Sequence, residues 1–142
     1  PAVISETGLC VWRSGPAPVL DLKSTGDFLQ GKLAIYYTGS SHDTPSMADS
    51  QRDYNRIAQS SFIARAGVME RSIDELAYHS VQLSEGMKEL PGISGSIAQK
   101  YLGGGFGGYA LYIFKTNEER DAAVRLCSSR MKAVEPYCRK LF

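Results

Sequence analysis

Short runs of apolar and β-branched residues predict strands along the chain. Leu9 to Arg13 and Val19 to Lys23 are separated by the turn sequence Gly15-Pro16-Ala17-Pro18, which predicts two extended segments facing each other. Lys32 to Thr38 is apolar on both faces, as expected for a central strand that helices cover on at least one side. A further strand is predicted from Tyr109 to Phe114.

The first predicted helix begins at Pro45, with Thr44 as its N-cap. It runs to about Ala66, and Gly67 closes it. Helical spacing brings its apolar residues to one face, which we expect to be buried. The residues of this face are Met47, Tyr54, Ile57, Ala58, Phe62 and Ala66.

Two more helices are predicted from capping boxes, in which a hydroxyl residue precedes a glutamate by three positions. Ser72-Ile73-Asp74-Glu75 begins a helix that ends before Pro91, and Thr116-Asn117-Glu118-Glu119 begins one that runs through about Lys132. A short strand or docked tail is expected from Pro136 to Phe142. The expected buried stripes are Ile73, Leu76, Ala77, Leu83 and Met87 in the first, and Ala123, Leu126, Cys127 and Met131 in the second.

Strands thus come before and after the first two helices. This order predicts an α+β fold in which helices form a layer against a mainly antiparallel sheet. A length of 142 residues and a hydrophobic content of 43% are sufficient for one domain with a buried core. The chain begins with Pro1 rather than methionine, which is compatible with a piece of a longer protein.

Charge and cysteine content exclude several function classes. The net charge of +1, spread along the chain, provides no basic stripe for nucleic acid. Cys10, Cys127 and Cys138 are far apart and form no Cys-x-x-Cys pair, which argues against a disulfide framework and a zinc site and favours the reducing cytoplasm. No apolar run approaches the roughly 20 residues of a bilayer span, so no membrane partner is expected.

The run Gly103-Gly104-Gly105-Phe106-Gly107-Gly108 is the main candidate for function. Glycine allows positive φ and close approach of a partner or a phosphate-bearing ligand, although a tight loop that feeds a strand would use glycine too. The run lacks the Gly-Lys-Ser/Thr of a Walker A loop, and a strand follows it where a dinucleotide fingerprint would open a helix. Gly105-Phe106-Gly107 is similar to an RNA-recognition signature, but Gly108 stands where an aromatic ring must stack on a base.

Together with Lys100, this run gives Lys-Tyr-Leu-Gly-Gly-Gly-Phe-Gly-Gly, which resembles the third glycine-rich motif of the GHMP family of small-molecule kinases, most closely its galactokinase branch. Thr38-Gly39-Ser40-Ser41-His42 resembles the family's turn between a strand and a long helix. Tyr78 to Leu83 resembles its helical His-x-x-Leu stretch, and Pro91 to Ser96 resembles the approach to the third motif. The resemblance covers roughly residues 30 to 132.

The resemblance implies that residues 1–142 form the C-terminal domain of a sugar kinase, with the family's ferredoxin-like arrangement and without the N-terminal ATP-loop domain. The full-length enzyme would use ATP and Mg²⁺ to phosphorylate a sugar hydroxyl. Because the family's phosphate loop and catalytic residue belong to the absent domain, we expect this chain alone to bind neither cofactor stably, to hold no catalytic residue or metal ligand, and to be inactive.

The implied nucleotide and substrate cleft contains Lys100 and the run from Gly103 to Gly108. Possible sugar contacts are His42, Asp43 and Tyr54, the last within Asp-Tyr-Asn-Arg, which is similar to a Glu-Tyr-Asn-x-Arg stretch of galactokinases. Simpler roles for these three residues are a surface turn, a helix cap and core packing, respectively.

The expected partners are the kinase's own N-terminal domain and a sugar. A face left uncovered by the absent domain could also produce a homodimer. The alternative function is a stand-alone α+β module that uses the same glycine loop for a small ligand or a partner protein.

Overall fold

Six strands form two antiparallel sheets in the computed structural model, which describes residues 6–41, 53–77, 89–103 and 107–136. The predicted α+β class with mainly antiparallel pairing is therefore confirmed. A two-stranded hairpin contains β1 (Leu9–Arg13) and β2 (Val19–Ser24). The larger sheet has the order β4-β5-β3-β6, from β3 (Leu33–Tyr37), β4 (Ser96–Tyr101), β5 (Tyr109–Phe114) and β6 (Met131–Val134).

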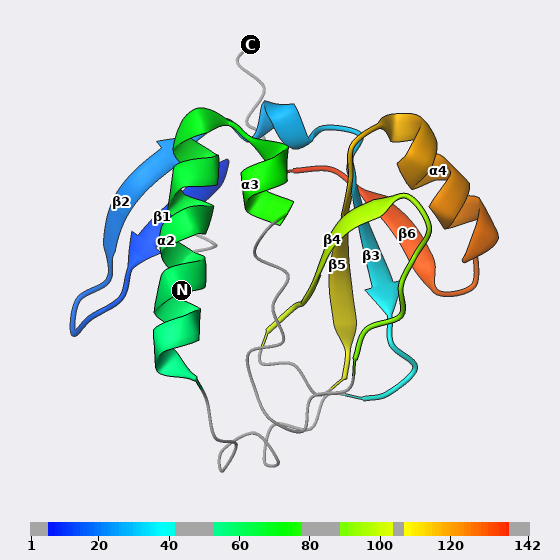
Figure 1. The fold of residues 1–142 in the computed structure, drawn as a ribbon, viewed down its shortest axis with the longest axis horizontal. Helices are drawn as coiled ribbons and strands as arrows, with labels where there is room; N and C mark the ends of the chain where they lie inside the picture. The colour runs from blue at the N-terminus through cyan, green and yellow to red at the C-terminus, as the bar shows by residue number, and fades with distance from the viewer. Residues whose placement is uncertain (1–5, 42–52, 78–88, 104–106, 137–142) are drawn as a thin grey trace.

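The helices lie on both faces of the larger sheet. They are α2 (Tyr54–Glu70), α3 (Ile73–Ala77) and α4 (Asn117–Leu126), and a short 3₁₀ turn, η1, spans Asp27–Leu29. From β3 onward the order is strand, helices, strand, strand, helix, strand, which is the element order of the split βαβ pattern. Figure 1 shows α2 beside the β1–β2 hairpin, α3 near β4 and α4 near β6.

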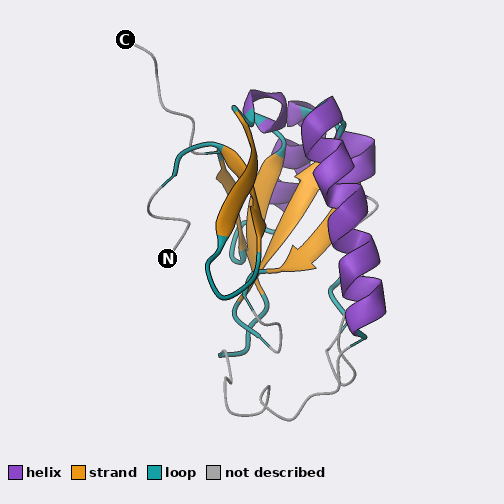
Figure 2. Cartoon of the chain, turned by 90° about the vertical axis from the view of Figure 1, so that its left-hand side faces the viewer, coloured by secondary structure: helices purple, strands orange, loops and turns teal. Residues whose placement is uncertain are grey.

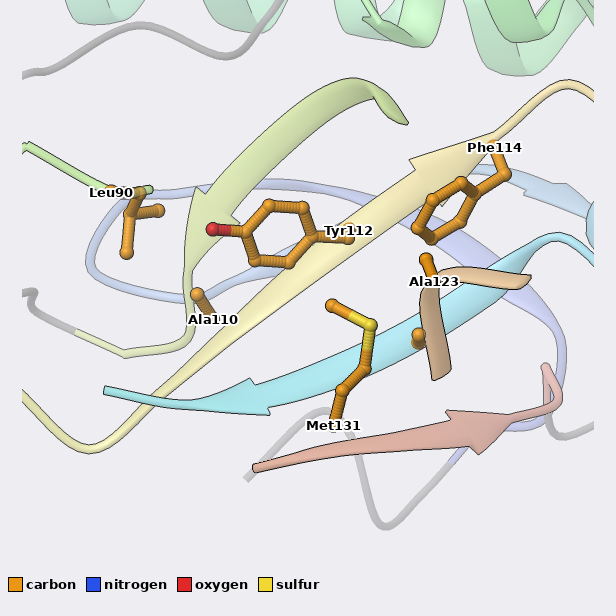
Figure 3. Close-up of a cluster of buried hydrophobic side chains, with 7 residues drawn as sticks. Leu90, Ala110, Tyr112, Phe114, Ala123 and Met131 are labelled. Atoms are coloured by element: carbon orange, nitrogen blue, oxygen red, sulfur yellow. The ribbon is translucent and has the colours of Figure 1, made fainter. Parts of the chain in front are cut away.

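The main core lies between the sheet and α4. Alternate residues of β5 point to this face, and Tyr112 and Phe114 are fully buried there beside Ala123 of α4 and Met131 of β6 (Figure 3). The Tyr112 hydroxyl donates a hydrogen bond of 2.8 Å to the Pro91 carbonyl oxygen. Burial raises the pKa of this phenol, so it stays neutral and fixes the segment that leads into β4.

The capping box predicted for α4 is confirmed. The Thr116 hydroxyl accepts from the Glu119 amide at 3.2 Å, and the Glu119 carboxylate accepts from the Thr116 amide at 3.1 Å. The predicted end near Lys132 is wrong, because the helix stops at Leu126 and the chain turns into β6.

This early end changes the predicted buried stripe. Ala123 is buried as expected, but Leu126 is 80% exposed. Met131 is buried from a strand rather than from a helix.

The long helix α2 differs from its prediction at both ends. It begins at Tyr54, after an N-cap in which the Asp53 carboxylate accepts from the Arg56 amide, so the predicted helix does not run unbroken through position 53. The predicted start at Thr44 and Pro45 lies outside the described residues. Gly67 does not close the helix, which continues to Glu70. A Cβ at Gly67 would come within 2.9 Å of the Leu76 amide nitrogen, so glycine here permits close packing of α2 and α3.

The predicted buried face of α2 is wrong in part. Tyr54 and Phe62 are each 74% exposed, whereas the inward side carries small residues such as Ser60, Ala64 and Gly67. Ile57, which was also on the predicted face, does lie on the inward side. Periodicity weights large apolar residues, and Tyr54 and Phe62 turned the predicted face away from the true one.

One further difference, the strand β4, concerns the segment between α2 and β5. The helix predicted from Ser72 begins as expected, with the Glu75 amide donating to the Ser72 hydroxyl at 3.2 Å. It is described only as far as Ala77, and its predicted continuation to Met87 lies outside the described residues. Strand β4 was not predicted.

The hairpin lies beside α2 (Figure 2). Arg65 of α2 pairs with Asp21 of β2 at 2.7 Å, and this hydrogen bond lowers the pKa of Asp21. Arg71 pairs with Asp27 and stacks over the Phe28 ring at 5.4 Å. These ion pairs are exposed, so each one adds little stability.

A less exposed ion-pair network ties β6 to α4 and to the turn before β3. Glu135 accepts from the Arg120 guanidinium at 2.8 Å and from the Gly31 amide at 2.7 Å. The Arg120 side chain is only 10% exposed. The Gly31 hydrogen bond and the Arg120 guanidinium lower the pKa of Glu135.

We expect Glu135→Gln to destabilise the fold at neutral pH by about 1–2 kcal/mol, because it leaves the nearly buried Arg120 with a weaker partner. A folded-state pKa below the ordinary glutamate value means that the stabilisation is complete above about pH 4.3 and is lost as pH falls through the lower folded-state pKa. Urea unfolding between neutral pH and pH ~3 should therefore show the wild-type advantage shrinking. Glu70→Gln, at an exposed helix end, should change stability by less than about 0.5 kcal/mol at every pH. A pH-independent difference for Glu135→Gln would contradict this account.

Cys10 and Cys127 are both free thiols, and Cys138 lies outside the described residues. None of the helices in the described part of the chain combines the length and apolar character that a bilayer span requires.

Candidate functional site

The candidate site lies at the end of the larger sheet where β3 stops and β5 starts (Figure 1). Antiparallel pairing places Tyr37 opposite Tyr109, so the turn that follows β3 meets the glycine run that precedes β5. These two segments are the ones that the kinase resemblance selected. They are 70 positions apart in sequence, measured between Thr38 and Gly108.

Three hydrogen bonds join the turn to the glycine run. The Gly108 carbonyl oxygen accepts from the Thr38 amide at 3.0 Å and from the Thr38 hydroxyl at 2.9 Å. The Gly108 amide donates to the Ser40 carbonyl oxygen at 2.9 Å. The end of the glycine run is therefore fixed against the turn.

Gly107 is required by this contact. Its φ is +119°, a conformation that residues with side chains rarely adopt, and a Cβ would overlap the Ser41 carbonyl oxygen. Gly103, at the other end of the run, is exposed with φ +78° and has open space around it. Gly104, Gly105 and Phe106 lie outside the described residues.

An exposed row of apolar side chains borders the run. Tyr37 and Tyr109 pack with ring centroids 5.4 Å apart and an interplanar angle of 49°. Leu102 directly follows the neighbouring strand β4 and donates its amide hydrogen to the Tyr109 carbonyl oxygen. The exposed fractions of these three side chains range from 39% to 50%, which is high for large apolar residues.

Arg130 adds positive charge at the same end of the sheet. Its carbonyl oxygen accepts from the Tyr37 amide at 2.8 Å, and its guanidinium lies over Gly39, where a Cβ would be 3.3 Å from Nη1. A guanidinium suits carboxylate or phosphate oxygens because it donates several hydrogen bonds from one plane.

Sequence reasoning missed Tyr37, Tyr109 and Arg130 as site residues. Tyr37 directly precedes the turn and Tyr109 directly follows the glycine run in the sequence. This adjacency could have identified both tyrosines as site residues. Arg130 was assigned to the interior of a helix, and only its true position just before β6 brings it to the site.

The other residues that the sequence suggested for the site are not placed with the turn and the glycine run. Lys100 lies within β4 and lines a cavity below α2, on the sheet face opposite the main core. Tyr54 is exposed at the start of α2, so core packing is wrong as an explanation for it. His42 and Asp43 lie outside the described residues.

Two backbone amides of the site and the described acidic side chains bear on anion and metal binding. The amides of Thr38 and Gly108 already bond within the protein, so neither points at an anion. Within the ranges that the structure describes, no group of three or more His, Cys, Asp or Glu side chains could hold a metal ion. The site can position a ligand and offer it one guanidinium, two phenols and an apolar surface.

Comparison of the chain with protein-family models and with curated proteins found no match.

Proposed function

We propose that this chain is the C-terminal domain of a GHMP-type sugar kinase, which transfers the γ-phosphoryl group of ATP to a sugar hydroxyl. The observation that carries the proposal is the contact of Thr38 with Gly108. It joins the two segments that resemble the family's motifs, although they are distant in sequence.

In this proposal the chain contributes positioning and electrostatic stabilisation rather than a base or a metal ligand. The Arg130 guanidinium is suited to phosphate oxygens. The exposed rings and hydroxyls of Tyr37 and Tyr109 are suited to a sugar, which has both apolar C–H faces and hydroxyl groups.

ATP and Mg²⁺ would be held mainly by an N-terminal domain, and the full enzyme would work in the cytoplasm. The glycine run would form one wall of a cleft shared with that domain. The 142-residue chain alone should then show no ATP-dependent phosphorylation of sugars.

The test compares the complete reading frame that contains this chain with the isolated chain, using a panel of monosaccharides and ATP. The proposal requires ATP-dependent phosphorylation by the complete product only. Thr38→Val keeps the side-chain shape but removes the hydroxyl that donates to Gly108, and we expect it to lower kcat/KM about fivefold in the complete product.

Thr7→Val, near the β1–β2 hairpin, is the matched control and should leave kcat/KM unchanged. A complete product that phosphorylates no sugar, or whose upstream sequence lacks a Gly-Leu-Gly-Ser-Ser-type segment, would favour the stand-alone binding module instead.

A further inference from the structure

A cavity of about 450 Å³ lies between the larger sheet and α2, on the face opposite the main core. The sheet residues alternate, so Leu33, Leu111 and Ile113 point away from the Tyr112 side and towards this cavity. The hairpin and the start of α3 complete its walls. The principal apolar lining residues are Leu9, Leu33, Ile57, Leu76, Leu111 and Ile113.

The size and lining of this cavity are those of a small-molecule site. Such sites typically have volumes of about 300–1,000 Å³, mostly apolar walls and a few placed polar groups. Atoms that line an unfilled apolar space lose dispersion contacts, and an engineered apolar cavity of about 150 Å³ in another protein binds benzene for this reason. The cavity below α2 is larger and would gain more contacts from an apolar ligand.

Lys100 is the charged residue among those that line the cavity. It is exposed, which places it where the cavity meets solvent. Within the described ranges, no carboxylate lies within ion-pair distance of its ammonium group. A ligand anion at this position would therefore have little competition from the acidic side chains of the described ranges.

We propose that this cavity binds a small amphipathic monocarboxylate, with an apolar tail between α2 and the sheet and its carboxylate at Lys100. The proposal stands apart from the kinase function, because it concerns the face below α2 and needs neither ATP nor a second domain. It also gives Lys100 a role, binding of the ligand carboxylate. Lys100 pairs with Leu111 in the sheet, on the cavity side and away from the contact of Thr38 with Gly108.

Decanoate is the probe. Decanol is the control that keeps the apolar tail without the charge, and acetate is the control that keeps the carboxylate without the long tail. Calorimetric titration of the chain should show saturable decanoate binding, weaker decanol binding and no acetate binding. Lys100→Gln should weaken decanoate about tenfold and leave decanol unchanged, since it removes one charge-assisted contact.

Ala64→Leu tests the location, because it projects a larger side chain into the cavity from a helix position that favours leucine. It should abolish decanoate binding, whereas Ala58→Leu, at an exposed position of the same helix, should not. Circular dichroism should show that both variants are folded.

Three results would each overturn the proposal. The first is the absence of saturable decanoate binding, as expected if the chain itself fills the space. The second is equal binding of decanoate and decanol. The third is decanoate binding that folded Ala64→Leu retains.

Discussion

Replacing Gly107 with alanine should reduce kcat/KM of the complete product, in the proposed kinase reaction, on the order of 100-fold, because a misplacement of about 1 Å near a reacting group can have that effect. The added Cβ overlaps the Ser41 carbonyl oxygen, and φ of +119° is strained for alanine. The turn after β3 and the glycine run must then separate. That movement would displace Arg130 and the two tyrosines of the proposed cleft.

Gly92→Ala is the matched control, because Gly92 has open space around it and no positive φ. Steady-state kinetics of both variants and their far-ultraviolet circular dichroism would separate a local displacement from unfolding. Near-normal kcat/KM in a folded Gly107→Ala enzyme would remove the glycine run from the proposed cleft. If the wild-type product has no kinase activity and Gly107→Ala only lowers the stability of the fold, the glycine has a purely structural role.

Phe114→Ala should destabilise the fold by about 3–5 kcal/mol, the usual cost of truncating a buried phenylalanine. Phe114 is fully buried at the end of β5 and belongs to the core cluster that contains Ala123 and Met131. A domain of this size is stable by only about 5–15 kcal/mol, so the variant should lose a large share of its stability. Urea unfolding followed by circular dichroism measures the loss directly.

Phe62→Ala makes the same chemical change at a side chain that is 74% exposed. It should alter stability by less than about 0.5 kcal/mol. Similar losses for the two variants would mean that the core does not lie between the sheet and α4.

Local sequence patterns were sufficient for the elements whose signals are local. The β1–β2 hairpin, β3, β5 and the start of α4 follow from apolar runs, turn residues and a capping box. In contrast, β4 is short and contains the polar residues Gln99 and Lys100, so its local strand signal is weak. The segment forms a strand because it pairs with β5. Tertiary pairing overrode weak local preference there.

The C-terminal elements show a second limit. Cys127 and Met131 are four positions apart, so a helical period continues through a segment that is in fact a turn and β6. Met131 is buried in either conformation, and a periodicity argument cannot distinguish them.

Two segments of the candidate site were predictable from the sequence, but the contact between them was not. The sequence indicated the turn from Thr38 and the glycine run, but only the pairing of β3 with β5 brings them into contact. Arg130 reaches the same place through the pairing of β6 with β3. Contacts between distant segments have no periodic signature, so their partners could not be read from the chain.

The order β4-β5-β3-β6 leaves β4 and β6 as the outermost strands. Each presents a lysine, Lys100 and Lys132, and β6 has only four residues. Short outer strands with cationic side chains resist addition of a strand from another molecule, because charges and few backbone donors make such pairing unfavourable. Self-association through the described edges of this sheet is therefore disfavoured, and the exposed side of α2, with Phe62, is the better surface for a homodimer among the described residues.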